Sequence, residues 1–157
     1  MKALQNQHGL SLVELLALLV ISSIMSVLVI GILVNALNTE KKVKVDTQLR
    51  EEADFYMASL INTIYTMKES EVCREERDFY FETDCSGESK LTGFLQEADG
   101  STSLYVDGRK LSGAYSQITI DSSSRLSKKK NIFTVMLVLN YNGKSKTFHS
   151  EIQSILN

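Results

Sequence analysis

The feature that most constrains this chain is an uncharged apolar stretch near its N-terminus. It runs for 23 residues from Leu15 to Leu37, and its only interruptions are Ser22, Ser23, Ser26, Gly31 and Asn35. An α-helix of that length rises about 1.5 Å per residue and crosses the roughly 30 Å hydrocarbon core of a bilayer. A transmembrane helix is therefore predicted. Two alternatives stay open: a signal peptide cleaved at Val34-Asn35-Ala36, and an anchor that is never processed.

Composition narrows the classes of function. The 157 residues are one domain's worth of chain. A formal net charge of −2 argues against a strongly basic nucleic-acid-binding protein, and two cysteines are too few for a disulfide-dense miniprotein. There are only two histidines, and no Gly-rich phosphate loop, Gly-x-Ser-x-Gly or His-Glu-x-x-His motif occurs. We therefore expect no enzymatic activity, no catalytic residue, no metal and no cofactor.

One carboxylate, Glu14, immediately precedes the apolar stretch. A carboxylate that enters lipid unpaired is costly, so an ionisable residue in such a helix is a candidate functional residue. A cleaved signal peptide or a plain anchor does not explain why it is there. Glu14 is therefore the first candidate site of the chain.

The residues around this carboxylate, His8-Gly9-Leu10-Ser11-Leu12-Val13-Glu14-Leu15-Leu16, resemble the processing motif of type IV prepilins and type II secretion pseudopilins. That motif has a glycine, an apolar residue, a glutamate five residues after the glycine, and then a transmembrane helix. The short polar leader with a basic residue, Lys2, also matches. The resemblance implies that residues 1–9 are a leader, that a prepilin peptidase cuts between Gly9 and Leu10, and that the new α-amino group of Leu10 is methylated.

Two positions depart from the family pattern. Leu10 stands where phenylalanine is commoner, which the family tolerates. Gly31 stands where many members have a helix-softening proline, and this chain has no proline. Any local unwinding of the helix would therefore depend on the weaker effect of glycine.

The resemblance gives Glu14 a role in assembly. Cleavage creates a positive amine four residues before it, so in a filament of parallel helices each Glu14 could pair with the Leu10 amine of a neighbouring subunit in a low dielectric. The helix dipole also favours an anion at this end. An alternative is that Glu14 reaches back to its own N-terminus.

The orientation of the chain in the membrane depends on which signal is followed. Lys41, Lys42 and Lys44 come after the span, and the positive-inside rule alone would place them in the cytoplasm. The prepilin motif implies the opposite, and we follow the motif. We expect a single-pass protein of the cytoplasmic (inner) membrane, with its head outside the cytoplasm, which enters a surface or periplasm-spanning filament after assembly.

The pattern after the span predicts a long stem helix. Seven apolar residues recur at spacings of three and four, which gives one apolar face; they are Val45, Leu49, Ala53, Tyr56, Leu60, Ile64 and Met67. We expect one helix over about residues 10–68, transmembrane over about 15–37, and a head over 69–157. The expected fold class is α+β, with this helix packed on an antiparallel sheet.

Alternating and turn residues predict the strands of the head. Ile118 and Ile120 alternate with polar residues, and the run from Ile132 to Leu139 reads as a central strand with Phe133, Val135, Leu137 and Leu139 on one face. Asn142-Gly143 predicts a hairpin, and Thr102–Val106 with Asp107-Gly108 predicts a further strand and turn. Asp78–Glu82 reads as a short strand, and Ser122–Asn131 as a polar loop.

Cys73 and Cys85 are expected to form a disulfide in an exported head, which would stabilise the fold by roughly 3 kcal/mol in the entropy model. Two buried free thiols are the alternative. Metal ligation by this pair is not expected because no second Cys or His pair accompanies it.

Weaker candidates have ordinary structural explanations. Glu97, Asp99 and Asp107 lack the spacing of a calcium loop, so turn chemistry explains them better. Lys128, Lys129 and Lys130 are expected in a solvated loop rather than against DNA. His8 lies in the leader, and His149 is expected to be structural or exposed.

The sequence thus predicts a structural filament subunit, more consistent with a minor pilin or pseudopilin than with a major subunit. The system it would serve is open among a type IV pilus, type II secretion and competence for DNA uptake. Expected partners are prepilin peptidase, other pilins or pseudopilins, membrane lipid and the inner-membrane assembly platform, with nucleic acid only in a competence system. The alternative is a membrane-anchored extracytoplasmic binding module that does not polymerise.

Overall fold

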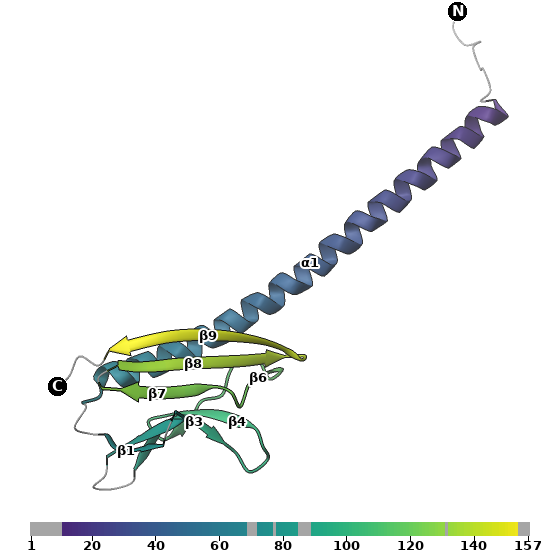
Figure 1. Cartoon of the computed structure of the whole chain (residues 1–157). Coiled ribbons are helices and arrows are strands. Elements are labelled where there is room, and N and C mark those ends of the chain that lie inside the picture. The colour runs from purple at the N-terminus through teal and green to yellow at the C-terminus, as the bar shows by residue number, and fades with distance from the viewer. Residues whose placement is uncertain (1–10, 69–71, 77, 85–88, 131, 154–157) are drawn as a thin grey trace, which may run out of the picture. The chain divides into compact units, whose positions relative to one another are not determined.

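The computed structural model describes residues 11–68, 72–76, 78–84, 89–130 and 132–153 (Figure 1). One α-helix, α1 (Leu12–Thr66), is followed by a nine-stranded antiparallel sheet, which confirms the predicted α+β fold. The chain divides into two compact units, Met1–Lys44 and Val45–Asn157, so α1 contributes to both.

Helix α1 covers 55 residues, within about two residues of the predicted start and end. No proline interrupts it, and Gly31 is its only glycine, at a cost of about 1 kcal/mol relative to alanine. Nothing lies within 4 Å of the position that a Cβ on Gly31 would occupy. Leucine, alanine and the other helix formers of this segment therefore maintain a regular helix through the apolar stretch.

The C-terminal part of α1 supplies the core of the second unit. All seven residues of the predicted stripe meet the sheet: Leu49, Ala53, Tyr56, Leu60, Ile64 and Met67 are buried, and Val45 packs against them. The residues selected by the 3.6-residue period of the sequence are thus the ones that pack against the sheet. The prediction of one apolar face is confirmed.

The strands of the sheet are β1 (Val72–Glu76), β2 (Tyr80–Thr83), β3 (Lys90–Gln96), β4 (Thr102–Val106), β5 (Arg109–Lys110), β6 (Ile118–Ile120), β7 (Arg125–Lys129), β8 (Ile132–Tyr141) and β9 (Lys144–Gln153). Their spatial order is β1-β2-β3-β4-β6-β8-β7, with β5 also on β4 and β9 also on β8. All pairings are antiparallel.

Strand β8 is the centre of the second half of the sheet, as the sequence predicts. It pairs along its full length with β9 and also bonds to β6 and β7. Phe133, Val135, Leu137 and Leu139 are all buried. Asn142 and Gly143 form the predicted hairpin turn, with φ values of 47° and 76°, as a two-residue turn of the primed type requires.

Two strand predictions need correction. Most of the predicted polar loop Ser122–Asn131 is instead a strand, because Arg125–Lys129 is β7 and pairs with β8; Asn131 lies outside the described residues. Leu126 fixes this strand in place, since it is the one apolar residue of the strand and is buried in the core. The predicted strand Asp78–Glu82 is shifted: Asp78 lies in a turn with φ 64°, and β2 begins at Tyr80.

Strands β4 and β6 are joined at one residue pair, Thr102 with Ile120, and then diverge. Beyond that pair, β4 bonds instead to the segment that follows its own hairpin: Tyr105 pairs with Lys110, and the N–H of Leu111 donates to the carbonyl of Leu104 at 2.8 Å. The chain from Leu111 to Gln117 then returns to β6. The two diverging strands leave an opening in the sheet.

Candidate functional site

The candidate processing residues Gly9 and Leu10 lie outside the described residues, as do Lys2 and His8. Glu14 is described, and it lies in the first turn of α1 with its side chain exposed. The helix begins at Leu12, two residues after Leu10 in the sequence.

Glu14 takes part in a reciprocal cap of the helix start. The N–H of Glu14 donates to the carbonyl of Ser11 at 3.0 Å and also to Ser11 Oγ at 3.3 Å, and the N–H of Ser11 donates to Glu14 Oε2 at 3.4 Å. The pattern Ser-x-x-Glu before an apolar helix is the capping box, in which each side chain satisfies a backbone donor that the helix leaves free. Ser11 and Glu14 display this signal in the sequence, and the sequence reasoning overlooked it.

The capping box gives Glu14 a function inside its own chain. The cap engages only one of the two carboxylate oxygens, because Oε1 has no partner among the described residues. Both bonds are long for N–H···O geometry, so the side chain is held loosely. Glu14 therefore retains one acceptor oxygen that a donor from another chain could approach at the helix N-terminus.

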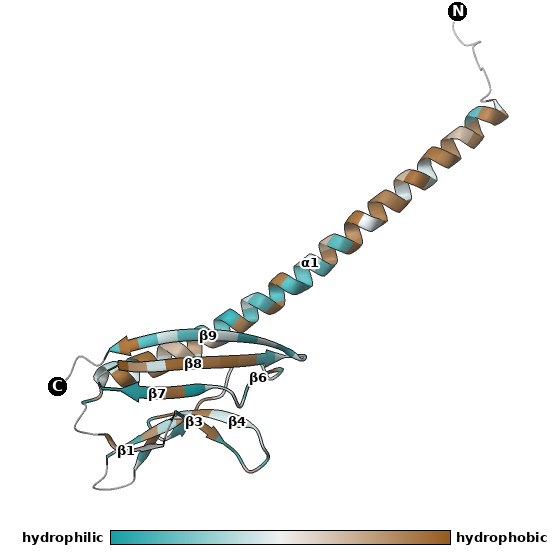
Figure 2. Ribbon diagram, viewed as in Figure 1, coloured by the Kyte–Doolittle hydropathy of each residue, from teal (hydrophilic) through white to brown (hydrophobic). Residues whose placement is uncertain are grey.

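The first half of α1 has no buried side chain among the residues that the structure describes. Its large apolar side chains from Leu12 to Leu37 are exposed, between 49% and 79% of their surface, and Figure 2 shows this half as almost continuously hydrophobic. The helix is long and apolar enough to cross a membrane. In a membrane, lipid would cover the apolar side chains that are otherwise exposed to water. The helix is therefore compatible with a membrane anchor.

The second unit contains a buried carboxylate that the sequence reasoning missed. Glu52 lies within the apolar stripe of α1 and is 1% exposed. The N–H of Ala114 donates to its Oε2 at 3.0 Å, whereas Oε1 has no hydrogen-bond partner among the described residues. Burial, and after it the charge of Glu52, raises the pKa of the Tyr56 hydroxyl above its usual range.

This carboxylate fastens the segment from Leu111 to Gln117 to the helix. A Cβ on Gly113 would lie 1.2 Å from Glu52 Oε1 and 2.6 Å from the Tyr56 hydroxyl, so only glycine fits above them. The neighbouring Glu51 accepts a 2.6 Å bond from the Tyr115 hydroxyl. Two adjacent carboxylates of α1 thus hold two adjacent residues of the segment.

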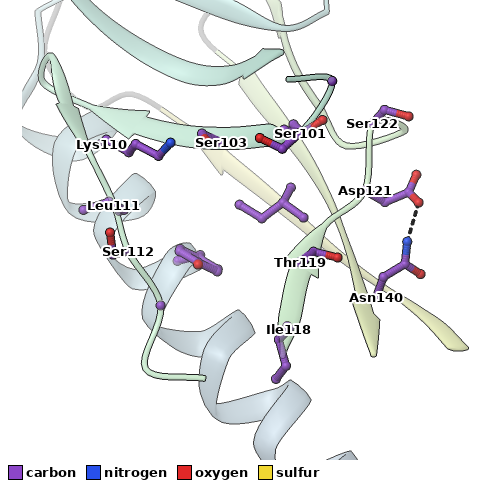
Figure 3. A pocket seen from close by; sticks show the side chains of 15 residues that line it. Ser101, Ser103, Lys110, Leu111, Ser112, Ile118, Thr119, Asp121, Ser122 and Asn140 are labelled. Atoms are coloured by element: carbon purple, nitrogen blue, oxygen red, sulfur yellow. Dashed lines mark hydrogen bonds between the residues drawn. The ribbon is translucent and has the colours of Figure 1, made fainter. Parts of the chain in front are cut away.

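A cavity of about 490 Å³ occupies the opening between the diverging strands β4 and β6 (Figure 3). Its wall is rich in hydroxyl groups, among them those of Ser101, Ser103, Ser112 and Thr119. Lys110 is its cation, and the Lys110 ammonium bonds to Glu97 Oε1 at 3.1 Å. One carboxylate, that of Asp121, also lines the cavity.

The three acids considered for calcium have local partners instead. Glu97 bonds to Lys110 and to the Tyr105 hydroxyl, and these bonds lower its pKa. Asp99 accepts the N–H and hydroxyl of Ser101, as an Asx turn does, and its pKa is lowered by them. Asp107 lies 3.6 Å from the Lys90 ammonium. Turn and ion-pair chemistry therefore accounts for all three acids.

No group of three or more potential ligands that could hold a metal occurs within the described part of the chain. Lys128 and Lys129 belong to β7 and Lys130 to the turn after it, where a loop was expected. Lys128 lies over the ring of Phe133, 5.9 Å from its centroid. His149 is exposed on β9.

Cys73 lies in β1 and is disulfide-bonded. Its expected partner, Cys85, lies outside the described residues, so the pairing of Cys73 with Cys85 stays a prediction.

Comparisons with family models, with curated proteins and with solved structures give no match for this chain.

Proposed function

We propose that this chain is a structural subunit, a minor pilin or pseudopilin, of a type IV pilus, type II secretion or competence filament. The observation that carries the proposal is the sequence from Gly9 to Glu14, followed without a break by a helix whose first half exposes apolar side chains and whose second half builds an α+β head. The chain is a building block in this proposal and catalyses no reaction.

The helix start supports the proposed assembly step. In the proposal prepilin peptidase cuts after Gly9, and the methylated amine of Leu10 lies one residue before the capping serine. The free oxygen of Glu14 then accepts the Leu10 amine of a neighbouring subunit. In an ion pair of this kind each charge gains a partner, which lowers the free-energy cost of placing it in a low dielectric. The pair also fixes the axial position of one helix relative to the other.

The orientation follows from the same proposal. The leader stays in the cytoplasm with the peptidase, the helix spans the inner membrane, and the head lies outside. Lys41, Lys42 and Lys44 then face the outer side, against the usual bias of positive residues. The disulfide at Cys73 supports this orientation, because disulfides persist in oxidising compartments.

The first test is the mature N-terminus. Mass spectrometry of the membrane-resident protein from cells that contain a prepilin peptidase is expected to find a chain that begins with methylated Leu10. Gly9→Val should block the cut by crowding the scissile bond, whereas His8→Gln, a change one residue earlier, should leave it intact. An intact Met1 terminus on the native protein would refute the proposal.

The second test separates processing from assembly. Glu14→Val should be cleaved and should accumulate in the membrane, because the change favours insertion by a few kcal/mol, yet it should be missing from sheared filaments. Glu14→Gln keeps an acceptor for the capping N–H of Ser11 and lacks the charge, so it isolates the ion pair from the cap. If both variants entered filaments as well as the wild type does, the proposed role of Glu14 in assembly would be wrong.

The second candidate function is a membrane-anchored binding module that does not polymerise. The observation that favours it is the hydroxyl-lined cavity between β4 and β6. A module of this kind predicts an unprocessed N-terminus and no effect of Glu14→Val on its activity, so the two tests above distinguish the candidates.

A further inference from the structure

The cavity between β4 and β6 is framed by two turns of the same construction, one between β3 and β4 and the other between β6 and β7. In the first turn, Asp99 accepts the N–H of Ser101 at 2.9 Å and its hydroxyl at 2.6 Å. In the second, Asp121 accepts the N–H and the hydroxyl of Ser123 at the same two distances. Residues of both turns line the cavity. Because such bonds favour one turn conformation, the rim of the cavity is preorganised.

The charged groups around the cavity are paired with groups of their own chain. Lys110 bonds to Glu97 Oε1 at 3.1 Å, and the same oxygen accepts the Tyr105 hydroxyl at 2.9 Å. Asp121 accepts the side-chain amide of Asn140 at 2.6 Å, in addition to its bonds within the turn (Figure 3). An ionic ligand would therefore compete with bonds that these groups already make. An uncharged ligand meets no such competition.

Three hydroxyl groups of the wall, in contrast, have no partner. Ser112, Thr119 and Ser122 line the cavity, and their hydroxyls make no hydrogen bond within the described part of the chain. They come from three segments: Ser112 follows β5, Thr119 lies in β6, and Ser122 lies in the turn before β7 (Figure 3). A hydroxyl can both donate and accept, so this wall complements a ligand that itself presents several hydroxyls.

Apolar side chains complete the wall. Leu111 and Ile120 line the cavity from the segment after β5 and from β6, and both are half-buried against the core. The wall thus combines apolar surface with unpaired hydroxyls. A saccharide has the same two kinds of surface, because C–H groups form the faces of its ring and hydroxyls project from its edge. The cavity volume of about 490 Å³ also falls within the range of roughly 300–1,000 Å³ that is usual for small-molecule sites.

We propose that the cavity between β4 and β6 binds a neutral saccharide. The ring of the saccharide lies against Leu111 and Ile120, and its hydroxyls exchange hydrogen bonds with Ser112, Thr119 and Ser122. The residues that line the cavity all belong to the second unit of the chain. The inference therefore holds for a filament subunit and for a membrane-anchored module alike.

The test is a titration of the full chain with neutral disaccharides, followed by NMR of the methyl groups of Leu111, Ile118 and Ile120. The chain is kept in micelles of a phosphocholine detergent, because a detergent with a sugar head group would compete for the cavity. The probes are maltose, cellobiose, lactose and chitobiose, and at least one of them should shift these methyl signals in a saturable way. Digalacturonic acid, an anionic disaccharide, should bind more weakly than that probe.

Two substitutions remove the unpaired hydroxyls. Thr119→Val keeps the shape of the side chain, and it should raise the dissociation constant about two- to tenfold, the contribution of one hydrogen bond. Ser112→Ala should do the same. The matched control is Thr147→Val, the same change at an exposed residue of β9 outside the cavity, which should leave the dissociation constant as it is.

Three results would overturn the proposal. The first is the absence of saturable shifts with all four neutral probes, and the second is tighter binding of digalacturonic acid than of any of them. The third is that the Thr119→Val and Ser112→Ala variants both bind like the wild type.

A longer probe distinguishes two sources of the ligand. Equal affinity for the disaccharide that binds and for the hexasaccharide of its series would indicate a free saccharide, whereas tighter binding of the hexasaccharide would indicate a segment of a polysaccharide. The outcome is separable from that of the proposed function. An intact Met1 terminus would refute the pilin proposal and leave saccharide binding untouched, and a methylated Leu10 without saccharide binding would do the reverse.

Discussion

Substitution of Gly113 by alanine is the sharpest perturbation of the head. The added Cβ would lie 1.2 Å from Glu52 Oε1, 2.4 Å from its Cδ and 2.6 Å from the Tyr56 hydroxyl. Glu52 is 1% exposed, and a shift of its carboxylate away from the new Cβ would disturb its 3.0 Å bond with the N–H of Ala114. The change therefore acts on a buried, singly bonded carboxylate.

The expected magnitude follows from two opposing effects. Gly113 does not have a positive φ, so alanine would ordinarily raise the free energy of unfolding by about 0.4–1 kcal/mol through the unfolded chain. A buried acceptor that loses its donor costs about 1–3 kcal/mol, and more if it is charged. The difference between the two effects leads us to expect that Gly113→Ala lowers the free energy of unfolding by about 0.5–2.5 kcal/mol.

The assay is urea unfolding of the full chain in micelles, followed by tyrosine fluorescence because the chain has no tryptophan. The matched background is Glu52→Ala, which removes the carboxylate that the new Cβ would strike. In that background Gly113→Ala should cost at least about 1 kcal/mol less, since residues in contact do not behave additively. Equal costs in the two backgrounds, or a Gly113→Ala variant as stable as the wild type, would refute the reasoning.

Three further outcomes are expected. Ser11→Ala removes the hydroxyl half of the helix cap, at about 0.5–2 kcal/mol of local stability. The amides of the first turn of α1 should then exchange faster with solvent in a hydrogen-exchange measurement, and unchanged exchange throughout that turn would dismiss the capping box. Cys73→Ser should lower the free energy of unfolding by about 2–4 kcal/mol, and a variant that melts with the wild type would contradict a stabilising disulfide. The pKa values of Asp99 and Asp121 lie below their usual 3.8 because of Ser101 and of Ser123 respectively. As the pH falls, these carboxylates are therefore protonated in the unfolded chain before they are in the folded chain, and the free energy of unfolding should fall below about pH 4. Asp121→Asn should make this dependence on pH less steep in acid-unfolding curves.

The parts of the fold that the sequence predicted are those that local patterns determine. The stripe on α1 repeats over six intervals, and the buried face of β8 repeats over four residues. The turn at Asn142-Gly143 follows from a dipeptide that tolerates positive φ at both positions. Each of these patterns lies within one helix, strand or turn, so the neighbouring residues alone are enough to predict it.

The parts that the sequence did not predict depend on distant residues. Strand β7 has one apolar core residue, Leu126, so no alternation reveals it, and its position depends on pairing with β8. Glu52 looks like a solvated charge in the sequence, whereas its partner Ala114 is 62 residues away. The capping box at Ser11 and Glu14 is the exception, because its four-residue pattern was available.

The packing of Val45–Thr66 into the head has a consequence for the order of events during biosynthesis. This half of α1 is made early, while β9, whose Ile152 completes the same core, is made last among the described strands. The ion pair between Asp46 and Lys146 joins residues 100 positions apart. The head thus cannot close while the chain is still emerging, because contacts of such long range form only when both ends are present. Its apolar stripe therefore stays without part of its core until β9 has been made.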